Sequence, residues 1–453
     1  MASHSLPTVP FVPAPSAASD AARCAVPGTP LAAVRAGIDT CVHCGFCLQS
    51  CPTYINLEDE NDSPRGRILL MRSVYEGSLD VRDESVRTHI DRCLGCRACE
   101  PVCPSGVPYG HLLEATRATL LRERPLAPVA RLILWLFAKP RLLSLAMGLS
   151  RLLRGTRLPA LGARVVGGRL GFALGMLDST KPTLARRTYA PHGTGERGTV
   201  TLLTGCVMEG LFASTNRATE RALTVNDYQM VPAPRQRCCG ALHAHSGDLE
   251  TARRLARANI AAFERSGAEF VVTNAAGCGA MMKEYGHLLR EDTAWADRAA
   301  RISAKVRDVS ELLAAAGPKP PRAELPATVT YDAPCHLLHA QRISAQPVQV
   351  LRAIPGVRLI PLTDTEQCCG AAGIYNLIEP ETSNAVLTPK IRNIAETRAQ
   401  FVATGNPGCL MQIGAGLRGA GLRTRAVHPV ELLDEAYARA ELGSGRARQG
   451  PRE

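Results

Sequence analysis

The chain has 453 residues, of which 45% are hydrophobic, 21% are charged and 4% are aromatic, and its formal net charge is +12. Its length and hydrophobic content suffice for two or three aliphatic cores, which excludes a largely disordered protein. The sequence begins without the basic and apolar regions of a secretion signal, and its best apolar run, 132–138, is far shorter than the roughly 18 residues of a membrane span. We therefore expect a cytoplasmic chain that is neither secreted nor integral to a membrane.

Residues 1–34 are rich in proline, alanine and serine and show no periodic pattern, so we expect a disordered arm. Cys24 lies in this arm and is interpreted as an incidental thiol. The chain has 17 cysteines, and without an export signal they should be thiols or metal ligands rather than disulfides.

Residues 35–123 contain two copies of the spacing C-x2-C-x2-C-x3-C-P, starting at Cys41 and at Cys93. This spacing is typical of bacterial proteins with two [4Fe–4S] clusters, in which the last cysteine of each run ligates the other cluster. We assign four cysteines to each cluster: Cys41, Cys44, Cys47 and Cys103 to cluster 1, and Cys93, Cys96, Cys99 and Cys51 to cluster 2. Structural zinc sites also contain C-x2-C pairs, but zinc does not explain the C-P ending of both runs.

The segment between the two runs carries apolar side chains at helical spacing and few strand signals, so this ferredoxin-type domain should be helical. The apolar positions are Ile68, Leu69, Met71, Val74 and Tyr75. His43 lies inside the first run, where it is either a polar loop residue or a hydrogen-bond donor to a cluster sulfide.

Residues 124–197 form a different segment, and its part 124–177 holds nine Arg and Lys residues and no Asp or Glu. Leucine, valine, isoleucine, Trp135 and Phe137 lie between the charges. Such a basic amphipathic helical connector is typical of a membrane surface or of a site for an acidic partner. The alternative is a buried helical linker whose arginines reach into water.

Two halves, 198–318 and 325–440, repeat the same cysteine pattern with offsets of 129, 130 and 131 residues. Their cysteines are Cys206, Cys238, Cys239 and Cys278 in the first half and Cys335, Cys368, Cys369 and Cys409 in the second. Short β-branched runs at 200–203, 270–273, 357–361 and 401–403 alternate with helical stretches, which indicates α/β units with a parallel sheet. Cysteines that follow such strands should gather at the carboxyl edge of the sheet. Residues 441–453 should be a disordered tail.

The predicted fold is therefore multidomain α and α/β: a helical two-cluster ferredoxin domain followed by two duplicated Cys-Cys-Gly halves. This layout resembles the iron–sulfur subunits of bacterial glycolate oxidase over about residues 35–440. The most specific parts are the first cysteine run, 41–54, and Ser63-Pro64-Arg65-Gly66-Arg67-Ile68. The iron–sulfur subunits of anaerobic glycerol-3-phosphate dehydrogenase and of lactate oxidation systems are similar in layout.

The resemblance implies that separate FAD-containing flavoprotein subunits oxidise glycolate to glyoxylate. This chain would then carry the electrons towards membrane quinone, from a peripheral position on the inner face of the cell membrane. We find no convincing flavin site in the sequence, so we expect no catalytic residue for substrate oxidation in the isolated chain. Lactate or glycerol-3-phosphate remains an alternative substrate of the complex.

The Cys-Cys-Gly halves are similar to heterodisulfide reductase subunits, in which the motif ends in C-x2-C and holds a noncubane [4Fe–4S] cluster. Here Met281 and Gln412 stand where the fifth cysteine would be. Four thiols per half still suffice for a further cluster in at least one half, and a crevice without metal is the alternative. A thiol–disulfide enzyme of heterodisulfide type is disfavoured by the missing cysteines. A zinc-containing nucleic-acid-binding protein is disfavoured because aromatic residues for stacking are scarce.

Five histidines stand near these cysteines in the sequence and could ligate iron or carry a proton. They are His243, His245, His336, His339 and His428. We expect most to be structural, with His428 as the best exception because the equivalent position in the first half is Asp308.

Overall fold

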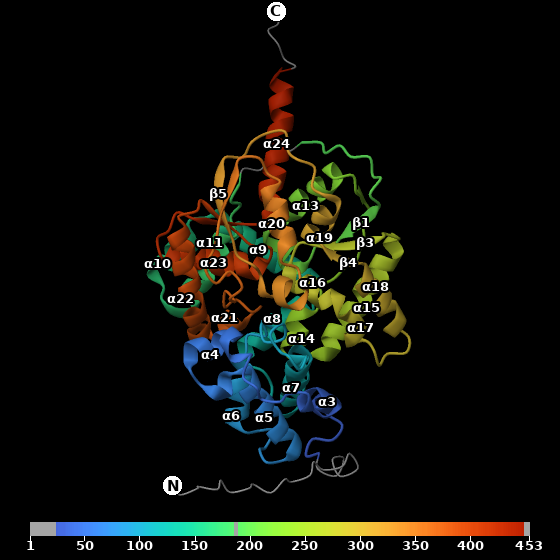
Figure 1. The fold of residues 1–453 in the computed structure, drawn as a ribbon, viewed down its shortest axis with the longest axis vertical. Helices are drawn as coiled ribbons and strands as arrows, with labels where there is room; N and C mark the ends of the chain where they lie inside the picture. Colours follow the sequence, from blue (N-terminus) through green and yellow to red (C-terminus); the bar gives the residue numbers. More distant parts are fainter. Residues whose placement is uncertain (1–23, 185–188, 448–453) are drawn as a thin grey trace, which may run out of the picture.

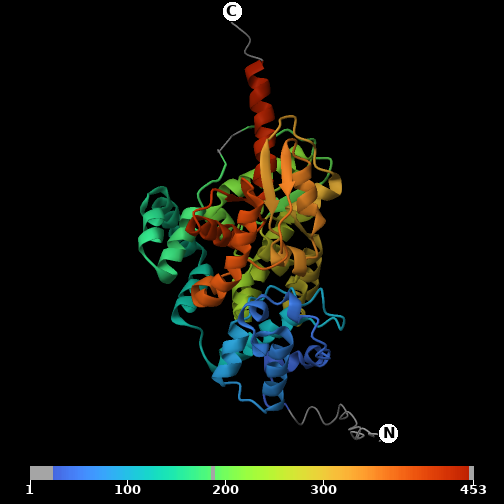
Figure 2. The same cartoon turned by 60° about the vertical axis from the view of Figure 1, so that its left-hand side comes forward.

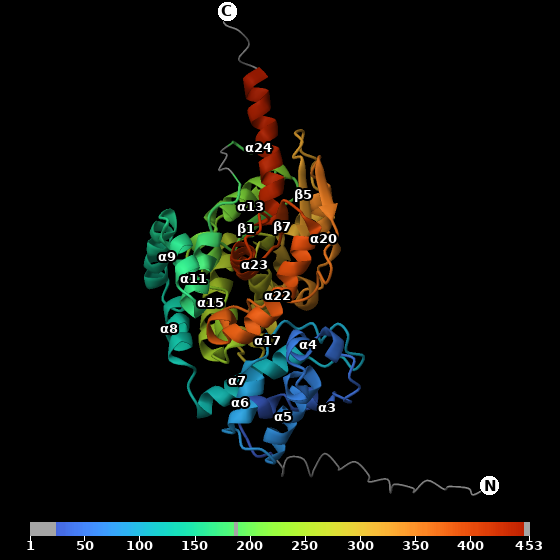
Figure 3. The ribbon, with the colours of Figure 1, turned by 90° about the vertical axis from the view of Figure 1, so that its left-hand side faces the viewer.

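The structure is a computed structural model that describes residues 24–184 and 189–447, with side chains up to Glu441. A helical N-terminal domain lies at one end of the molecule, and the two α/β halves lie side by side above it (Figure 1). The helices of the connector form a separate layer along one flank of the halves (Figures 2 and 3). The multidomain fold, helical first and then twice α/β, agrees with the expectation from the sequence.

The N-terminal domain consists of helices around one apolar core. They are α2 (Pro30–Ala33), α3 (Arg35–Asp39), α4 (Pro52–Leu57), α5 (Pro64–Glu76), α6 (Glu84–Asp91) and α7 (Tyr109–Glu123), with short 3-10 turns at Leu48–Ser50 and Glu60–Asp62. Ser63 caps α5 by accepting a hydrogen bond from the Gly66 N–H, and Pro64 supplies a first residue that needs no hydrogen-bond partner.

The expectation of a disordered arm over residues 1–34 is wrong for its last part. Residues 24–34 are ordered: Leu31 is fully buried, and its N–H donates to Thr119 Oγ1 at 2.9 Å. A few apolar residues in a proline-rich segment thus pack against α7, which no local pattern reveals. Residues 1–23 lie outside the described part of the chain.

The connector consists of α8 (Pro128–Phe137), α9 (Pro140–Gly155), α10 (Leu158–Val165) and α11 (Gly168–Ser179). Arg154 ties it to the first half, because its Nη1 donates to the carbonyls of Thr180 and Leu211 at 2.8 Å each. Within the described residues no single helix is long and apolar enough to cross a bilayer. Together α8 and α9 have the necessary length and composition, but they are bent by 106°.

Each half contains a four-stranded parallel sheet with the same strand order, as a duplication requires. The first sheet has the order β2-β1-β3-β4, and the second has the order β6-β5-β7-β8. The strands are β1 (Thr199–Leu202), β2 (Gln229–Met230), β3 (Phe270–Thr273), β4 (Val306–Asp308), β5 (Ala327–Tyr331), β6 (Val357–Ile360), β7 (Phe401–Ala403) and β8 (Arg425–Val427).

Helices cover the two sheets and carry the cysteine loops. In the first half they are α12 (Cys206–Leu211), α13 (Ala213–Val225), α14 (Ala241–His245), α15 (Leu249–Ser266), α16 (Ala276–Lys283), α17 (Tyr285–Leu288), α18 (Ala296–Lys305) and α19 (Val309–Ala316). In the second half a π-helix (His336–Ala340) is followed by α20 (Ala345–Arg352), α21 (Tyr375–Ile378), α22 (Pro380–Thr397), α23 (Pro407–Gly419) and α24 (Pro429–Ala447). The expected disordered tail therefore begins with the last helical turns of α24.

The two halves share one hydrophobic core, which runs from the first sheet through α13 to the second sheet and α24. Helix α24 of the second half packs on α13 of the first. Polar bonds reinforce this contact: Thr215 donates to Glu431 at 2.8 Å, and Arg221 pairs with Asp434 at 2.5 Å. The carboxyl edges of both sheets thereby face a common region.

Candidate iron–sulfur and cavity site

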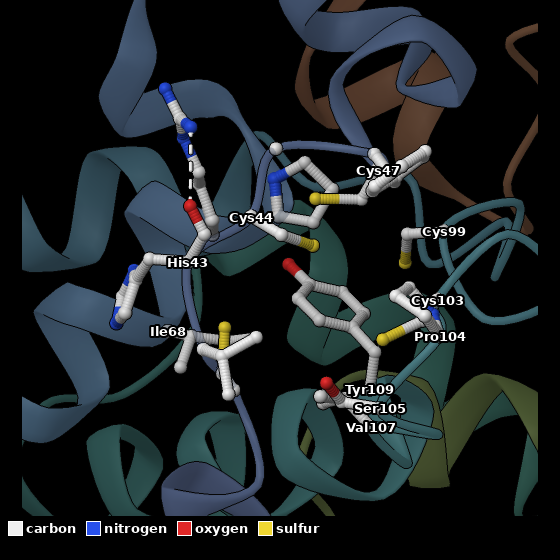
Figure 4. Close-up of a pocket in the computed structure, with 16 residues that line it drawn as sticks. His43, Cys44, Cys47, Ile68, Cys99, Cys103, Pro104, Ser105, Val107 and Tyr109 are labelled. Carbon is white, nitrogen blue, oxygen red and sulfur yellow. Dashed lines mark hydrogen bonds between the residues drawn. The ribbon is translucent and has the colours of Figure 1, made fainter.

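The loop 41–47 wraps its three cysteines around a small cavity that Cys103 completes. Figure 4 shows the sulfur atoms of Cys44, Cys47 and Cys103 directed into one space beside the ring of Tyr109. The loop turns sharply because His43 and Gly45 both take left-handed conformations, with φ of 54° and 88°. Arg65 fixes the loop from α5 by donating to the His43 carbonyl at 3.4 Å. The structure thus places His43 in the turn.

The second cysteine run adopts the same turn, with left-handed conformations at Gly95 and Arg97. The Gly95 N–H donates to Cys93 Sγ at 3.4 Å, and the Tyr109 hydroxyl donates to the same sulfur at 3.5 Å. Burial raises the pKa of Cys99 well above its usual value, with further contributions from Cys96, Cys93 and Cys51. The four cysteines assigned to cluster 2 are therefore near neighbours, and Cys99 also lines the first cavity.

A buried polar network holds Cys51, the residue that the first run contributes to the second group. The Thr53 hydroxyl lies 3.2 Å from Cys51 Sγ and donates to the Asp62 carbonyl at 2.7 Å. Arg67 is fully buried and binds Thr53 at 3.1 Å and the Asp62 carboxylate at 3.0 Å. The Ser-Pro-Arg-Gly-Arg segment thus holds the thiol of Cys51 in place through hydrogen bonds and does not itself provide a ligand.

The donor set of both groups fits [4Fe–4S] clusters. Each group offers four thiols, three from one tight loop and one from the other run, which matches the need for three adjacent corners and a fourth from elsewhere. Burial raises the pKa of Cys47 to about 11, so the thiol holds its proton at neutral pH until metal displaces it. Cluster assembly therefore releases protons.

The eight cysteines of the two halves line a single cavity of about 760 Å3. In the first half Cys206 Sγ lies 3.5 Å from Cys238 Sγ, and in the second half Cys369 Sγ lies 3.3 Å from Cys409 Sγ. The cysteines come from different loops at the carboxyl edges of the sheets, where parallel α/β sheets bind ligands. The crevice expected from the strand–cysteine pattern is present, and it is shared by both halves.

One thiol in each half has a pKa well below its usual value. Hydrogen bonds from Cys206 and Cys239 lower the pKa of Cys238, and those from Cys335 and Cys369 lower the pKa of Cys368. The repeated arrangement favours the deprotonated form of the cysteine at the same place in both halves. A thiolate is the form of cysteine that binds metal.

The second cysteine run of the ferredoxin-type domain contacts the second half directly. Leu94, Cys368 and Tyr375 form a small apolar cluster, against which Cys96 and Cys335 pack. The Tyr375 hydroxyl also donates to the Arg92 carbonyl at 2.8 Å, which fixes the two domains against each other. The thiols of cluster 2 and those of the second half are thus separated by a few side chains only.

His428 is not a ligand candidate in the structure. Its Nδ1 accepts from the Val430 N–H at 3.1 Å, its Nε2 bonds to the Asn274 carbonyl at 2.9 Å, and burial lowers its pKa to about 4. Asp308 does the same work in the first half, where its side chain accepts from the Ser310 N–H at the start of α19. The aligned pair is explained by helix capping, so the exception made for His428 is wrong.

The other four histidines divide into two groups. His243 bonds to the Leu134 carbonyl of α8 at 3.0 Å, and His339 bonds to the Glu366 carbonyl at 3.1 Å, which is the structural role expected of them. His245 and His336 instead line the cavity of the eight cysteines, with their ring centres 5.2 Å apart.

Some residues that shape the site carry no signal in the sequence. Tyr109 hydrogen-bonds to Cys93, which precedes it by 16 residues, and only the fold brings the two together. Asn406 donates to Cys409 Sγ at 3.5 Å and also receives the Gly277 N–H at 3.3 Å, so it joins the two halves at the cavity. The sequence analysis also did not predict that apolar side chains of α8, α9 and α11 line the cavity.

Comparison with known proteins agrees with this geometry. Residues 37–107 match the family of the 4Fe–4S dicluster domain, and residues 200–283 and 329–414 each match the cysteine-rich domain family. The chain is 39% identical to the probable glycolate oxidase iron–sulfur subunit of Bacillus subtilis (strain 168), over 87% of this chain and 93% of that protein. It is 32% identical to the glycolate oxidase iron–sulfur subunit of Escherichia coli (strain K12), with the same shares. Lactate utilization protein A of an Exiguobacterium species is 29% identical over 53% of this chain and 99% of its own length.

Proposed function

Because this chain belongs to the family of glycolate oxidase iron–sulfur subunits, we propose that it carries electrons from a flavoprotein that oxidises glycolate to glyoxylate towards a membrane quinone. The chain is an electron-transfer subunit with [4Fe–4S] clusters. One observation carries the finer proposal: the thiol groups follow one another from the exposed Cys44, through Cys96, to the shared cavity. The substrate-oxidising site then lies in the partner, because the two Gly-x-Gly-x-x-Gly spacings of the sequence, 193–198 before β1 and 414–419 inside α23, do not lie between a strand and a following helix, as a dinucleotide loop does.

The ligand sets follow from the same arrangement. Cluster 1 takes Cys41, Cys44, Cys47 and Cys103, and cluster 2 takes Cys93, Cys96, Cys99 and Cys51. At least one Cys-Cys-Gly half holds a further cluster, and the second half is favoured because its Cys335 and Cys368 pack beside Cys96. The clusters supply one-electron carriers when bound; the chain's own residues fix their spacing and exclude water from them.

The direct test is reduction of the clusters by substrate. The complex is purified without oxygen, glycolate is added, and the clusters are followed by EPR with and without the flavoprotein subunits. We expect reduction only when the flavoprotein is present, and faster reduction with glycolate than with lactate or glycerol-3-phosphate. Clusters that stay oxidised in the complete complex with glycolate contradict the proposal, and reduction by lactate alone assigns the chain to lactate oxidation.

We expect the flavoprotein to dock at the exposed end of the ferredoxin-type domain. Val42 and Phe46 flank Cys44 and are 68% and 66% exposed, which is unusual for large apolar side chains next to a redox site. Replacing Phe46 by Asp should slow glycolate-driven cluster reduction about tenfold, because a charge replaces an apolar contact in a docking surface. Stopped-flow absorbance measures the rate. Phe46→Leu, which keeps the surface apolar, should retain it; an unchanged rate in Phe46→Asp places the dock elsewhere.

We expect the connector to contact the membrane surface. Its outer face exposes large apolar side chains, all between 52% and 74% accessible: Leu132, Trp135, Leu145, Leu149, Leu152, Leu158, Leu161 and Val165. Exposed arginines lie among them, including Arg131, Arg141 and Arg151. An apolar face bordered by positive charge suits the surface of an anionic bilayer.

Changing Arg131, Arg141 and Arg151 together to Gln should weaken binding to phosphatidylglycerol vesicles about 100-fold at low salt, since each contributes about 1 kcal/mol near an anionic surface. Vesicle sedimentation measures the partition coefficient. The matched control changes three exposed arginines of α15 and α18, Arg254, Arg265 and Arg301, and should bind as the unaltered chain does. Equal binding by both triple variants contradicts a membrane role of the connector.

A further inference from the structure

The cavity between the two halves has a lining of several chemical kinds. The eight thiols form one part, apolar side chains of the connector form another, and charged side chains of α6 and α7, among them Arg87 and Arg117, form a third. The apolar part includes Ile133 and Phe137 of α8 and Met176 of α11. A volume of about 760 Å3 lies within the range of pockets that bind drug-sized molecules.

His245 gives the cavity a ring nitrogen that is free to bind a ligand. Its Nδ1 lies 2.8 Å from Glu114 Oε1 of α7, while its Nε2 is shielded from solvent and has no hydrogen-bond partner among the described residues. The neighbouring His336 is already engaged, since its Nε2 bonds to the Gly95 carbonyl at 3.1 Å. An unsatisfied buried nitrogen is costly unless a ligand or a water binds it. His245 therefore offers a free hydrogen-bonding nitrogen in the same cavity as the thiols and the apolar side chains of the connector.

The helices of the connector lie between this cavity and the outside of the molecule. Helix α8 turns Ile133 and Phe137 towards the cavity and exposes Leu132 and Trp135 on its other side. The same thin layer of helices thus has one apolar face towards the thiols and one towards the surroundings.

We propose that the cavity binds a lipophilic quinone, with its ring against the connector wall and one carbonyl oxygen hydrogen-bonded to His245. This proposal rests on the proposed function, which supplies the electrons. Reduction of the quinone takes two electrons, delivered singly by the iron–sulfur chain, and two protons, which turn both ring carbonyls into hydroxyls. The protons come from water, and the Glu114–His245 pair is placed to pass one of them to the bound carbonyl.

The experiment uses photolabelling of the cluster-loaded full-length chain with a short-chain azido-quinone. We expect saturable labelling of peptides from α8 or α11, competed by a short-chain quinone without the azide. Ile133→Trp should weaken binding about tenfold by filling the cavity, and Ser144→Trp, which adds the same bulk to the exposed face of α9, should bind normally. EPR of the reduced clusters verifies that each variant is loaded.

A second variant keeps the test independent of the fold of α8. His245→Gln should weaken quinone binding about tenfold, because one hydrogen bond is lost without a change in the apolar wall. Labelling outside the cavity lining, or unchanged binding in both Ile133→Trp and His245→Gln, overturns the proposal. If glycolate reduces the clusters of the complete complex but no quinone labels this chain, the cavity assignment fails and the proposed function stands. If glycolate does not reduce the clusters, the proposed function itself fails.

Discussion

Replacing Cys96 by Ser is expected to remove cluster 2 and to interrupt electron flow through the chain. Cys96 sits in the second cysteine run and packs against the apolar cluster that contains Cys368, so its loss affects both a ligand set and the contact with the second half. Burial raises its pKa well above the usual value, and further contributions come from Cys368, Cys51 and Cys93, which are its near neighbours. A serine hydroxyl at this position is a far poorer iron ligand than a thiolate.

Iron analysis and quinone reduction test this expectation. The iron content should fall by about four atoms per chain, the number in one cubane cluster. Glycolate-driven quinone reduction by the complex should fall more than about 100-fold, because the remaining carriers are separated by the missing one. Cys24→Ser removes a thiol outside both runs and should leave iron content and rate unchanged. Full iron content in Cys96→Ser would show that cluster 2 has a different ligand.

The second large effect is expected at Arg67, the largest fully buried side chain of the described chain. Its guanidinium binds Asp62 at 3.0 Å, Thr53 at 3.1 Å and the His89 carbonyl at 2.6 Å. Removal of one partner leaves the buried Asp62 carboxylate with Arg92 as its remaining arginine partner. Breaking such a pair typically costs about 3–5 kcal/mol.

Arg67→Met should therefore lower the unfolding free energy of the ferredoxin-type domain by about 3–5 kcal/mol. Guanidinium titration of the cluster-loaded chain, followed by cluster absorbance without oxygen, measures the change. Release of the cluster held by Cys51 should come first, because Thr53 links Arg67 to that thiol. Arg82→Met breaks an ion pair with Glu123 in which Arg82 is 74% exposed, and it should leave the unfolding free energy nearly unchanged because solvent screens the pair. Equal shifts in both variants would mean that the buried network does not stabilise the domain.

The sequence predicted the duplicated α/β architecture because the repeat of Cys-Cys-Gly and the strands before the cysteines are local patterns. Candidate strands at 200–203, 270–273 and 401–403 coincide with β1, β3 and β7 to within a residue. The edge strands β2, β4 and β8 are only two or three residues long, too short for a periodic signal. Residues 24–34 are ordered because Leu31 packs against the rest of the domain, and amino-acid composition does not predict such a tertiary contact.

The site was predictable only as far as the cysteines. Spacing alone separates a cysteine run from a disulfide framework, but it does not show that Cys96 lies against the second half. His428 illustrates the opposite error: a difference between two aligned positions suggested chemistry, whereas Asp308 and His428 both cap a helix. The wall of α8, α9 and α11 escaped prediction because amphipathic periodicity does not tell which face of a helix meets a cavity.

The packing of α24 against α13 affects how the chain folds while it is being synthesised. Asn226 of the first half donates to the hydroxyl of Tyr437, and Leu432 and Leu433 complete the same core as Leu223. The part of the core that the two halves share is therefore incomplete while the ribosome is still making the second half. The shared cavity also lacks the second set of cysteines until then, whereas both runs of the ferredoxin-type domain have already emerged. We therefore expect iron to be inserted first into the N-terminal domain. The shared cavity should be the last site to form.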